Sequence, residues 1–213
     1  MSDSSPPPAD AHWIVGGLIF PGFELLDLYG PLEMFGASSK HFTLVTIAET
    51  AEPVPSAQGP SSTVQRTFAE CGDVDILLVP GGIGTRKEAA NPALLTFLRN
   101  VYPQLDLLAS VCTGAGLLAA AGLLEGRRAT TNKLSFAWPR SRGPNTVWVP
   151  EARWVEDGNV FTSAGVAAGM DMSLALIARL LGEAAAEEVA RYTEYEWHRD
   201  ADWDPFARRA GLL

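Results

Sequence analysis

The amino-acid sequence predicts an α/β protein in which a mostly parallel β-sheet is covered by helices on both faces. Strand-like apolar runs alternate with helical segments from residue 13 to about residue 197, a pattern that favours parallel strands joined by helices. The run at 75–80 leads directly into GGIGT, a glycine-rich turn. The 213 residues show no internal repeat, and their number is enough for one domain with a substantial core.

Four apolar runs form the predicted centre of the sheet. They are WIVGGLIF (13–20), HFTLVTIA (41–48), DILLVP (75–80) and LDLLASV (105–111). The first helix is expected at 25–37, and a Pro/Gly/Ser-rich connection follows the second run through residue 61. The third run leads through GGIGT to a helix that opens with Asn91 as its N-cap and Pro92 at its first position.

The second half of the chain continues the alternation. The fourth run leads into a helix from about Thr113 to Ala121, which ends at Gly122. Residues 126–163 are richer in Trp, Val and Thr, and we expect short strands and loops at the edge of the sheet. Two helices, 168–182 and 183–198, precede an acidic, aromatic tail.

Composition and charge narrow the function classes. Lys and Arg number 16 against 25 Asp and Glu, for a formal charge of −9, which disfavours nucleic acid and anionic membranes as partners. No apolar run reaches the length of a membrane span, and the start of the chain has neither the basic nor the apolar part of a signal peptide. We therefore expect a cytoplasmic protein with a disordered leader (1–11) and a single domain (12–213).

Cys112 stands where the fourth strand meets its helix. A tight turn there would expose the sulfur, and the helix N-terminus would favour the thiolate, which is the geometry of a nucleophile elbow. The alternative is a small buried apolar residue, the commonest fate of a free cysteine. Two cysteines and three scattered histidines predict no disulfide framework and no metal site, and Cys71, at the amino end of a strand, is expected to be structural.

Two further strand ends carry candidate groups. Gly81 and Gly82 follow the third strand, and their N–H groups, with the turn at Thr113, would make an oxyanion hole; alternatively they form only a turn. Asp27 follows the first strand, among leucines that would enclose its carboxyl. A neighbouring thiolate would raise the pKa of that carboxyl, so that the pair shares a proton. A helix cap is the alternative role for Asp27, and Glu24 is a weaker rival.

Four segments of the sequence resemble the DJ-1/PfpI superfamily, and most closely its isocyanide hydratase-like branch. They are DLYGPLEMF, VPGGIGT, SVCTGAGLLAAAGLLEGRRATT and DGNVFTSAGVAAGMDMSLALIARLLG. The resemblance implies a flavodoxin-like three-layer α/β sandwich, a homodimer, and no cofactor. It also implies Cys112 as nucleophile and Asp27 as general acid/base. Gly82 and the Thr113 backbone would orient the bound groups, with Gly165 and Val166 lining the pocket.

The activity implied by the resemblance is hydration of a small, fairly apolar isocyanide to an N-substituted formamide through a thioimidate on Cys112. Thr113 stands where peptidase-like relatives carry histidine, and this difference argues against protease activity. Asn132-Lys133 stands where hydratase-like relatives tend to place His-Trp, so the natural substrate is left open. Two alternatives remain: glyoxalase- or deglycase-like chemistry on reactive carbonyls, and a non-catalytic protein that senses oxidants or binds a ligand through Cys112.

Overall fold

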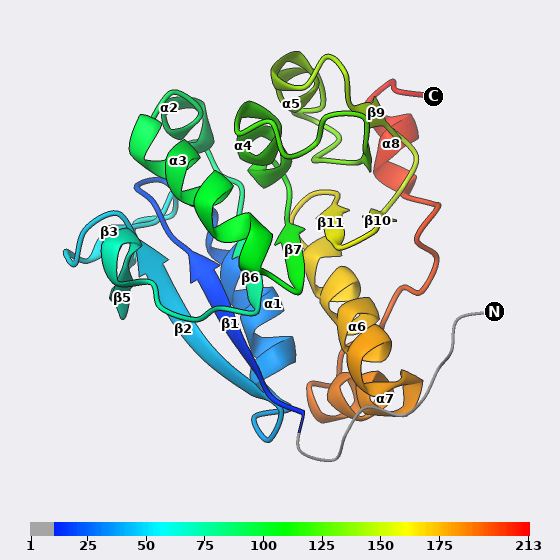
Figure 1. Cartoon of the computed structure of the whole chain (residues 1–213). Helices are drawn as coiled ribbons and strands as arrows, with labels where there is room; N and C mark the ends of the chain where they lie inside the picture. The colour runs from blue at the N-terminus through cyan, green and yellow to red at the C-terminus, as the bar shows by residue number, and fades with distance from the viewer. Residues whose placement is uncertain (1–10) are drawn as a thin grey trace.

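A computed structural model describes residues 11–213. The leader predicted at 1–11 therefore lies outside the described residues, apart from Ala11. Seven strands form one twisted sheet in the order β10-β11-β7-β6-β1-β2-β5 (Figure 1). All neighbouring pairs are parallel except β10 and β11 at one edge. The predicted α/β fold with a mostly parallel sheet is thus confirmed.

The strands of the sheet have the following bounds: β1 Trp13–Leu18, β2 Phe42–Ala48, β5 Arg66–Thr67, β6 Ile76–Val79, β7 Leu107–Ser110, β10 Trp154–Asp157 and β11 Val160–Ser163. The core of the order, β2-β1-β6-β7-β11, corresponds to the flavodoxin-like order 2-1-3-4-5. Strands β6, β7 and β11 are buried along their whole length, because helices cover both of their faces.

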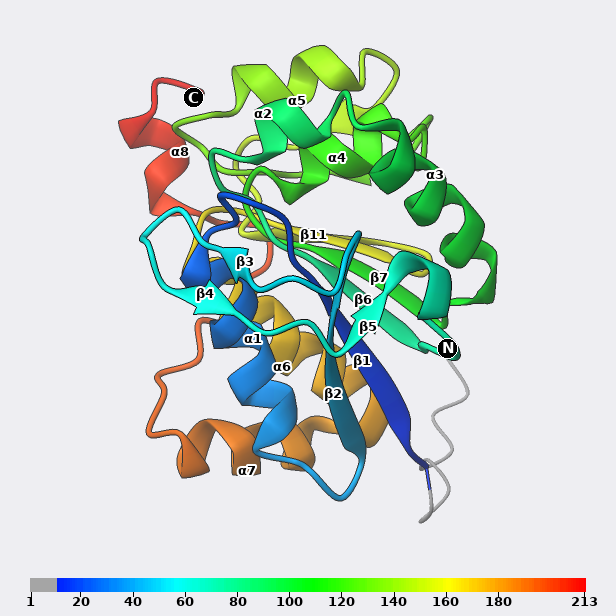
Figure 2. The same ribbon diagram turned by 90° about the vertical axis from the view of Figure 1, so that its left-hand side faces the viewer.

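The helices form two layers, one on each face of the sheet (Figure 2). One layer holds α2 (Thr85–Glu88), α3 (Pro92–Val101), α4 (Gly114–Ala120) and α5 (Ala137–Arg142). The other holds α1 (Leu25–Gly36), α6 (Ala168–Leu181) and α7 (Glu183–Tyr192). The cap predicted for α3 is present, since the Asn91 side chain accepts a hydrogen bond from the Ala93 N–H, 3.0 Å away.

The structure differs from the sequence prediction in two ways in the segments that were expected to be short strands and loops. The short strands β3 (Val54–Pro55), β4 (Ser61–Ser62), β8 (Arg128–Ala129) and β9 (Val147–Trp148) lie outside the main sheet. Helix α5 interrupts residues 126–163, and its Pro139 sits in the first turn, where a missing N–H costs little. The ring of Trp138 explains the position of α5, because it packs where a Cβ on Gly116 of α4 would stand, 2.3 Å away.

Helices α1 and α6 pack closely beside each other. A Cβ on Gly30 of α1 would lie 2.9 Å from Cγ of Met170, and one on Gly169 of α6 would lie 2.8 Å from Val111. Gly169 therefore allows α6 to approach the sheet, whereas a Cβ at position 30 would require the flexible Met170 side chain to move. This packing holds the first turn of α1 against the carboxyl ends of the central strands.

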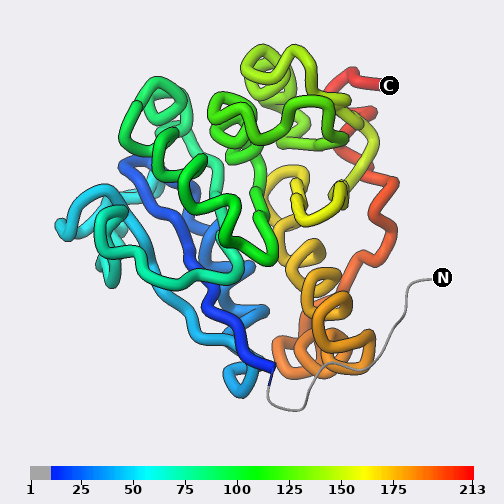
Figure 3. The backbone as a smooth tube through the Cα atoms, viewed as in Figure 1, coloured from blue at the N-terminus to red at the C-terminus, as the bar shows by residue number. Residues whose placement is uncertain are grey.

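The chain after α7 runs back along the molecule to α8 (Pro205–Arg209), which ends beside α5 (Figure 3). The predicted helix at 183–198 instead ends at Tyr192, and a buried carboxylate explains the early end. Asp171 of α6 accepts hydrogen bonds from the Tyr195 hydroxyl (3.1 Å) and the His198 N–H (2.9 Å). Its other oxygen accepts from Arg153 at 2.7 Å. An extended backbone delivers these donors to Asp171.

In the part of the chain that the structure describes, no helix has both the length and the apolar character needed to cross a bilayer.

The Asp171 network predicts a strong dependence of stability on one buried carboxylate. Asp171→Ala leaves the nearly buried Arg153 guanidinium without its charge partner, which costs about 3–5 kcal/mol. Urea unfolding followed by far-UV circular dichroism measures this loss. The matched control is Glu188→Ala, which removes an exposed ion pair with Arg191 and should cost less than about 1 kcal/mol. Equal losses in the two variants would contradict the role given to Asp171.

Candidate active site

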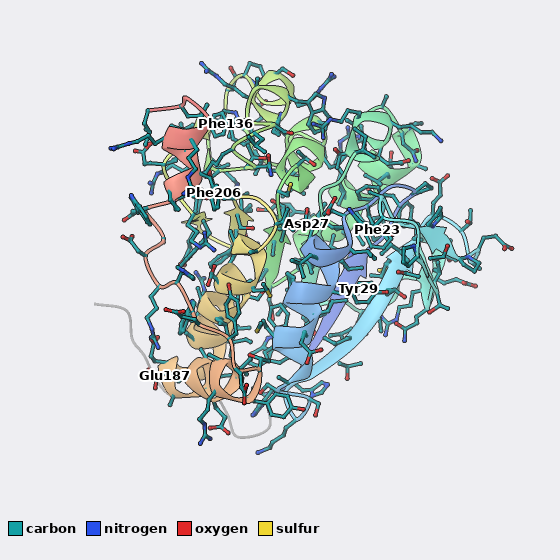
Figure 4. All side chains as sticks on the ribbon, turned by 180° about the vertical axis from the view of Figure 1, so that it is seen from behind. Phe23, Asp27, Tyr29, Phe136, Glu187 and Phe206 are labelled. Atoms are coloured by element: carbon teal, nitrogen blue, oxygen red, sulfur yellow. The ribbon has the colours of Figure 1, made fainter. Side chains whose placement is uncertain are left out.

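The candidate residues meet at the carboxyl ends of three neighbouring strands. Asp27 lies in the first turn of α1, after β1, and Gly81 follows β6. Cys112 follows β7, the next strand of the sheet. The strand order reverses between β1 and β6, and open parallel sheets bind ligands at such a switch point. Figure 4 shows Asp27 at the start of α1, beside these strand ends.

Cys112 occupies a strained turn between β7 and α4. Its φ angle is 56°, a left-handed conformation that costs a non-glycine residue on the order of 1–3 kcal/mol. Three hydrogen bonds hold the turn: Cys112 N–H to Ala164 O (3.2 Å), Thr131 hydroxyl to Cys112 O (2.7 Å), and Gly114 N–H to Val111 O (2.9 Å). The strain and its support indicate that the position of the sulfur is fixed by the fold.

The Asp27 carboxyl is fully buried and has one backbone donor. Its Oδ2 accepts a hydrogen bond from the Gly81 N–H at 2.9 Å. Its Oδ1 is also buried, and no standard hydrogen bond from the described residues reaches it. The helix-cap alternative does not apply, since Asp27 lies inside α1 and Glu24 stands at the N-cap position. The carboxyl also lies within hydrogen-bonding reach of the Cys112 thiol, and this contact affects the pKa of both groups.

The two ionisable groups of the site both favour their neutral forms. Burial raises the pKa of Asp27 to about 8, against the opposing hydrogen bond from Gly81. Burial and the neighbouring Asp27 raise the pKa of the Cys112 thiol. The raised carboxyl pKa was expected, but its main cause is burial and not the thiolate. The backbone N–H of Thr113, at the N-cap of α4, favours the thiolate as expected, but burial and the neighbouring Asp27 outweigh it, so the net shift of the thiol pKa is upward.

The glycine turn has a different role from the one expected. We expected Gly81 and Gly82 to offer free N–H donors to an anion. Instead Gly81 donates to Asp27, and Gly82 donates to the Thr113 hydroxyl at 3.1 Å. A Cβ on Gly81 would stand 2.6 Å from the Thr113 nitrogen and 2.8 Å from Asp27 Oδ2. Gly81 thus lets the acid and the cysteine turn approach each other, while the Thr113 N–H faces the Cys112 sulfur.

Sequence reasoning missed Thr85 and underrated Glu24. The Thr85 hydroxyl is buried and donates to Gly82 O at 2.7 Å, which fixes the glycine turn. Its place three residues after the Gly81-Gly82 pair was a usable signal, since a hydroxyl there can bond back to the turn. Glu24 is partly buried, and its charge adds to the rise in pKa at both Asp27 and Cys112.

Gly165 and Val166 line a cavity of about 440 Å³ next to the cysteine turn. Its other walls include Asn132, Lys133 and Phe206 of α8, while Cys112 is not among its lining residues. Lys133 is buried, which lowers its pKa to about 8, and its Nζ donates to the Thr130 hydroxyl at 2.8 Å. The Asn132-Lys133 pair, which differs from hydratase-like relatives, and Phe206 of the C-terminal tail thus line the same cavity.

The histidines lie elsewhere and serve other contacts. His12 bonds to Lys40 O and the Thr43 hydroxyl, and His41 bonds to Ala11 O. Cys71 is buried, and burial raises the pKa of its thiol. Among residues 11–213, no cluster of three or more His, Cys, Asp or Glu side chains could hold a metal ion.

Fold and site together define an α/β protein with a cysteine–carboxyl pair at the switch point of a flavodoxin-like sheet. The chain belongs to the DJ-1/PfpI family, which it matches over residues 15–179. It is 36% identical over 181 residues to an isonitrile hydratase of Pseudomonas putida, a match that covers 85% of this chain and 78% of the hydratase. It is 30% identical to the Parkinson disease protein 7 homolog of Danio rerio, over 81% of this chain and 92% of that protein.

A solved structure and a longer relative are also similar to this chain, in agreement with its membership of the DJ-1/PfpI family. A ThiJ/PfpI family protein from Pseudomonas syringae superposes with a TM-score of 0.80 and 31% identity, covering 100% of this chain and 90% of that one. A transcriptional regulator of the HTH type from Pseudomonas aeruginosa is 29% identical over 81% of this chain, but the match spans only 52% of the regulator.

The raised pKa of Asp27 predicts a pH-dependent effect of Asp27→Asn on stability. Between pH 4 and pH 8 the folded protein keeps a proton that the unfolded chain has released, because the folded pKa is about 8 and the ordinary value is 3.8. The wild type therefore loses up to about 1.4 kcal/mol of stability per pH unit in this window, whereas the amide of the Asp27→Asn variant does not titrate and adds no such loss. Urea unfolding at pH 5, 6 and 7.5 should show the variant gaining on the wild type as pH rises. A pH-independent difference between the two proteins would contradict the raised pKa.

Proposed function

We propose that this protein is an enzyme that hydrates isocyanides to N-substituted formamides, with Cys112 as nucleophile and Asp27 as general acid/base. The observation that carries the proposal is the pairing of a thiol in a strained, fixed turn with a buried acid that lies within hydrogen-bonding reach of that thiol. The similarity to an isonitrile hydratase over most of the chain supports the choice of reaction. No cofactor is needed for this chemistry.

The first step adds the thiol across the terminal carbon of the isocyanide. The pair enters the reaction neutral at pH 7, since Asp27 holds its proton up to a pKa of about 8. The Cys112 sulfur forms a bond to the terminal carbon of R–N≡C, and Asp27 gives its proton to the same carbon. The thiol proton passes to the Asp27 carboxylate. The product is the thioimidate R–N=CH–S–Cys112, and Asp27 is again protonated.

The second step consumes one water molecule. The water oxygen attacks the thioimidate carbon, and Asp27 relays a proton to the substrate nitrogen. The carbon–sulfur bond then breaks, the remaining water proton returns to Cys112, and R–NH–CHO leaves. The sum is R–N≡C plus water to the formamide. A buried acid with a pKa near the working pH suits such a relay, because it can both give and take a proton.

The remaining site residues position this pair in the proposed enzyme. The Gly81 N–H orients Asp27 by donating to its carboxyl. The Gly82 N–H orients Thr113 by donating to its hydroxyl. The Thr113 N–H faces the sulfur and stabilises negative charge that develops there. Gly165 and Val166 form part of the pocket wall for the small-molecule substrate, beside the cysteine turn. The homodimer and the cytoplasmic location stay predictions.

The redox-sensing alternative has weaker support from the site. A sensor cysteine reacts with peroxide as an accessible thiolate. Cys112 is only 7% exposed, and burial and Asp27 raise the pKa of its thiol. The site therefore suits a substrate that accepts a proton from the Cys112–Asp27 pair better than it suits an oxidant, which reacts with a free thiolate.

The proposal predicts turnover of an aryl isocyanide by the wild type, followed by loss of isocyanide absorbance and by mass-spectrometric detection of the formamide. Cys112→Ala removes the nucleophile and should abolish turnover. Asp27→Asn removes the proton relay, and the rate constant should fall by about a hundredfold or more. Cys71→Ala is the matched control, because Cys71 is an equally buried thiol outside the site.

A wild-type protein without formamide product would overturn the proposed reaction. The same four proteins would then be assayed with methylglyoxal, where Cys112-dependent turnover would establish the glyoxalase-like alternative. If Cys112→Ala kept full hydratase activity, the assignment of the nucleophile would be wrong.

A further inference from the structure

A guanidinium group lies close to the cysteine turn of the candidate active site. Arg86 belongs to the short helix α2, directly after the glycine turn. Its Nη1 donates to the Thr85 hydroxyl at 3.0 Å, and that hydroxyl lies 3.2 Å from the Thr113 hydroxyl. Since Thr113 follows Cys112, one continuous contact path joins the guanidinium to the cysteine turn. Burial lowers the pKa of Arg86, and the charge of a Cys112 thiolate opposes this shift, so the two groups are close enough to interact electrostatically.

The side chain of Arg86 is held in place by an aromatic ring. Its guanidinium lies over Trp138 of α5, 4.3 Å from the ring centroid, which is a cation–π arrangement. Trp138 is itself seated on Gly116, in the helix that begins just after Cys112. The ring, Thr85 and the backbone of α4 therefore fix the cation relative to the sulfur.

Arg86 has no anionic partner among residues 11–213. No carboxylate of these residues lies within ion-pair distance of it, and only one of its N–H groups makes a hydrogen bond. A partly buried arginine ordinarily uses its planar fork on a carboxylate or phosphate. The two acids nearest the site, Asp27 and Glu24, are instead engaged with Gly81 and Gln58.

We propose that Arg86 is the substrate-recognition residue of this site and that it selects small electrophiles bearing a carboxylate. The inference rests on the proposed function for its reacting group, because an isocyano acid would place its isocyanide carbon at Cys112 and its carboxylate on Arg86. This revises the fairly apolar substrate expected from the sequence. The fixed fork supplies two parallel N–H donors, the geometry that a carboxylate accepts.

The alternative is that Arg86 only packs on Trp138 and stabilises α5. Arg142 provides the comparison within the same chain, since its guanidinium also lies near the Trp138 ring, 5.7 Å from the centroid. Arg142 is exposed and makes no hydrogen bond to Thr85 or Thr113. A purely structural cation would give no preference for charged over neutral reagents at Cys112.

The test compares two alkylating reagents of nearly equal size at Cys112, in a Cys71→Ala background. Iodoacetate carries a carboxylate and iodoacetamide does not, and both form a carbon–sulfur bond with loss of iodide. The ratio of their rate constants cancels any change in the thiol pKa, because both reagents need the same thiolate. Peptide mass spectrometry over time measures both rates. The Arg86→Gln variant should lower the iodoacetate-to-iodoacetamide ratio by at least about fivefold.

Two further variants sharpen this result. Arg86→Lys keeps the charge but loses the planar fork, so it should keep part of the preference. Arg142→Gln should leave the ratio at its wild-type value. An unchanged ratio in Arg86→Gln, or an equal fall in Arg142→Gln, would overturn the proposal. Far-UV circular dichroism confirms that each variant is folded.

A second measurement joins the inference to turnover. Isocyanoacetate and its methyl ester differ in the same charge, and the wild type should favour the acid by a lower KM. Arg86→Gln should raise KM for the acid about tenfold and leave that of the ester unchanged. If neither compound is turned over, the hydratase proposal fails while the alkylation ratio still decides the role of Arg86. If both turn over equally well in wild type and Arg86→Gln, the recognition role is wrong and the hydratase proposal stands.

Discussion

The hydrogen bond from the Gly81 N–H to the buried Asp27 carboxyl is the interaction on which the site depends. It joins the end of β6 to the first turn of α1 across the switch point of the sheet. It requires glycine at position 81, because any Cβ there would displace Thr113 or the carboxyl. It holds the acid within hydrogen-bonding reach of Cys112, in a buried environment where the proton stays on the carboxyl.

The site stores unfavourable free energy that the surrounding structure offsets. A left-handed cysteine, a buried acid and a buried thiol each cost stability. The strands behind them are buried on both faces, and the Asp171 network fastens the last segment of the chain to α6. These rigid elements keep the strained turn in one conformation, so that the sulfur, the acid and the Arg86 cation have fixed relative positions.

Much of this arrangement could be predicted from the sequence, because strand ends in a parallel sheet converge. The alternation of runs predicted the sheet, and the places of Asp27, Gly81 and Cys112 after strands predicted their proximity. The pKa of the thiol could not be predicted, since it depends on how deeply the sulfur is buried. Helix α5 and the stacking of Arg86 were missed as well, because both depend on the ring of Trp138 filling the space left by Gly116, a contact between residues distant in sequence.

The central claim is that Asp27 is protonated at neutral pH in the folded protein. Carboxyl ¹³C NMR of protein labelled at aspartate, titrated from pH 4 to pH 10, tests it most directly, with Asp27→Asn identifying the resonance. The account predicts that this carboxyl titrates with a pKa of about 8, while exposed aspartates titrate near their ordinary value. Titration of Asp27 near pH 4 would mean that the acid is ionised beside the thiol, and the neutral cysteine–acid pair proposed here would be wrong.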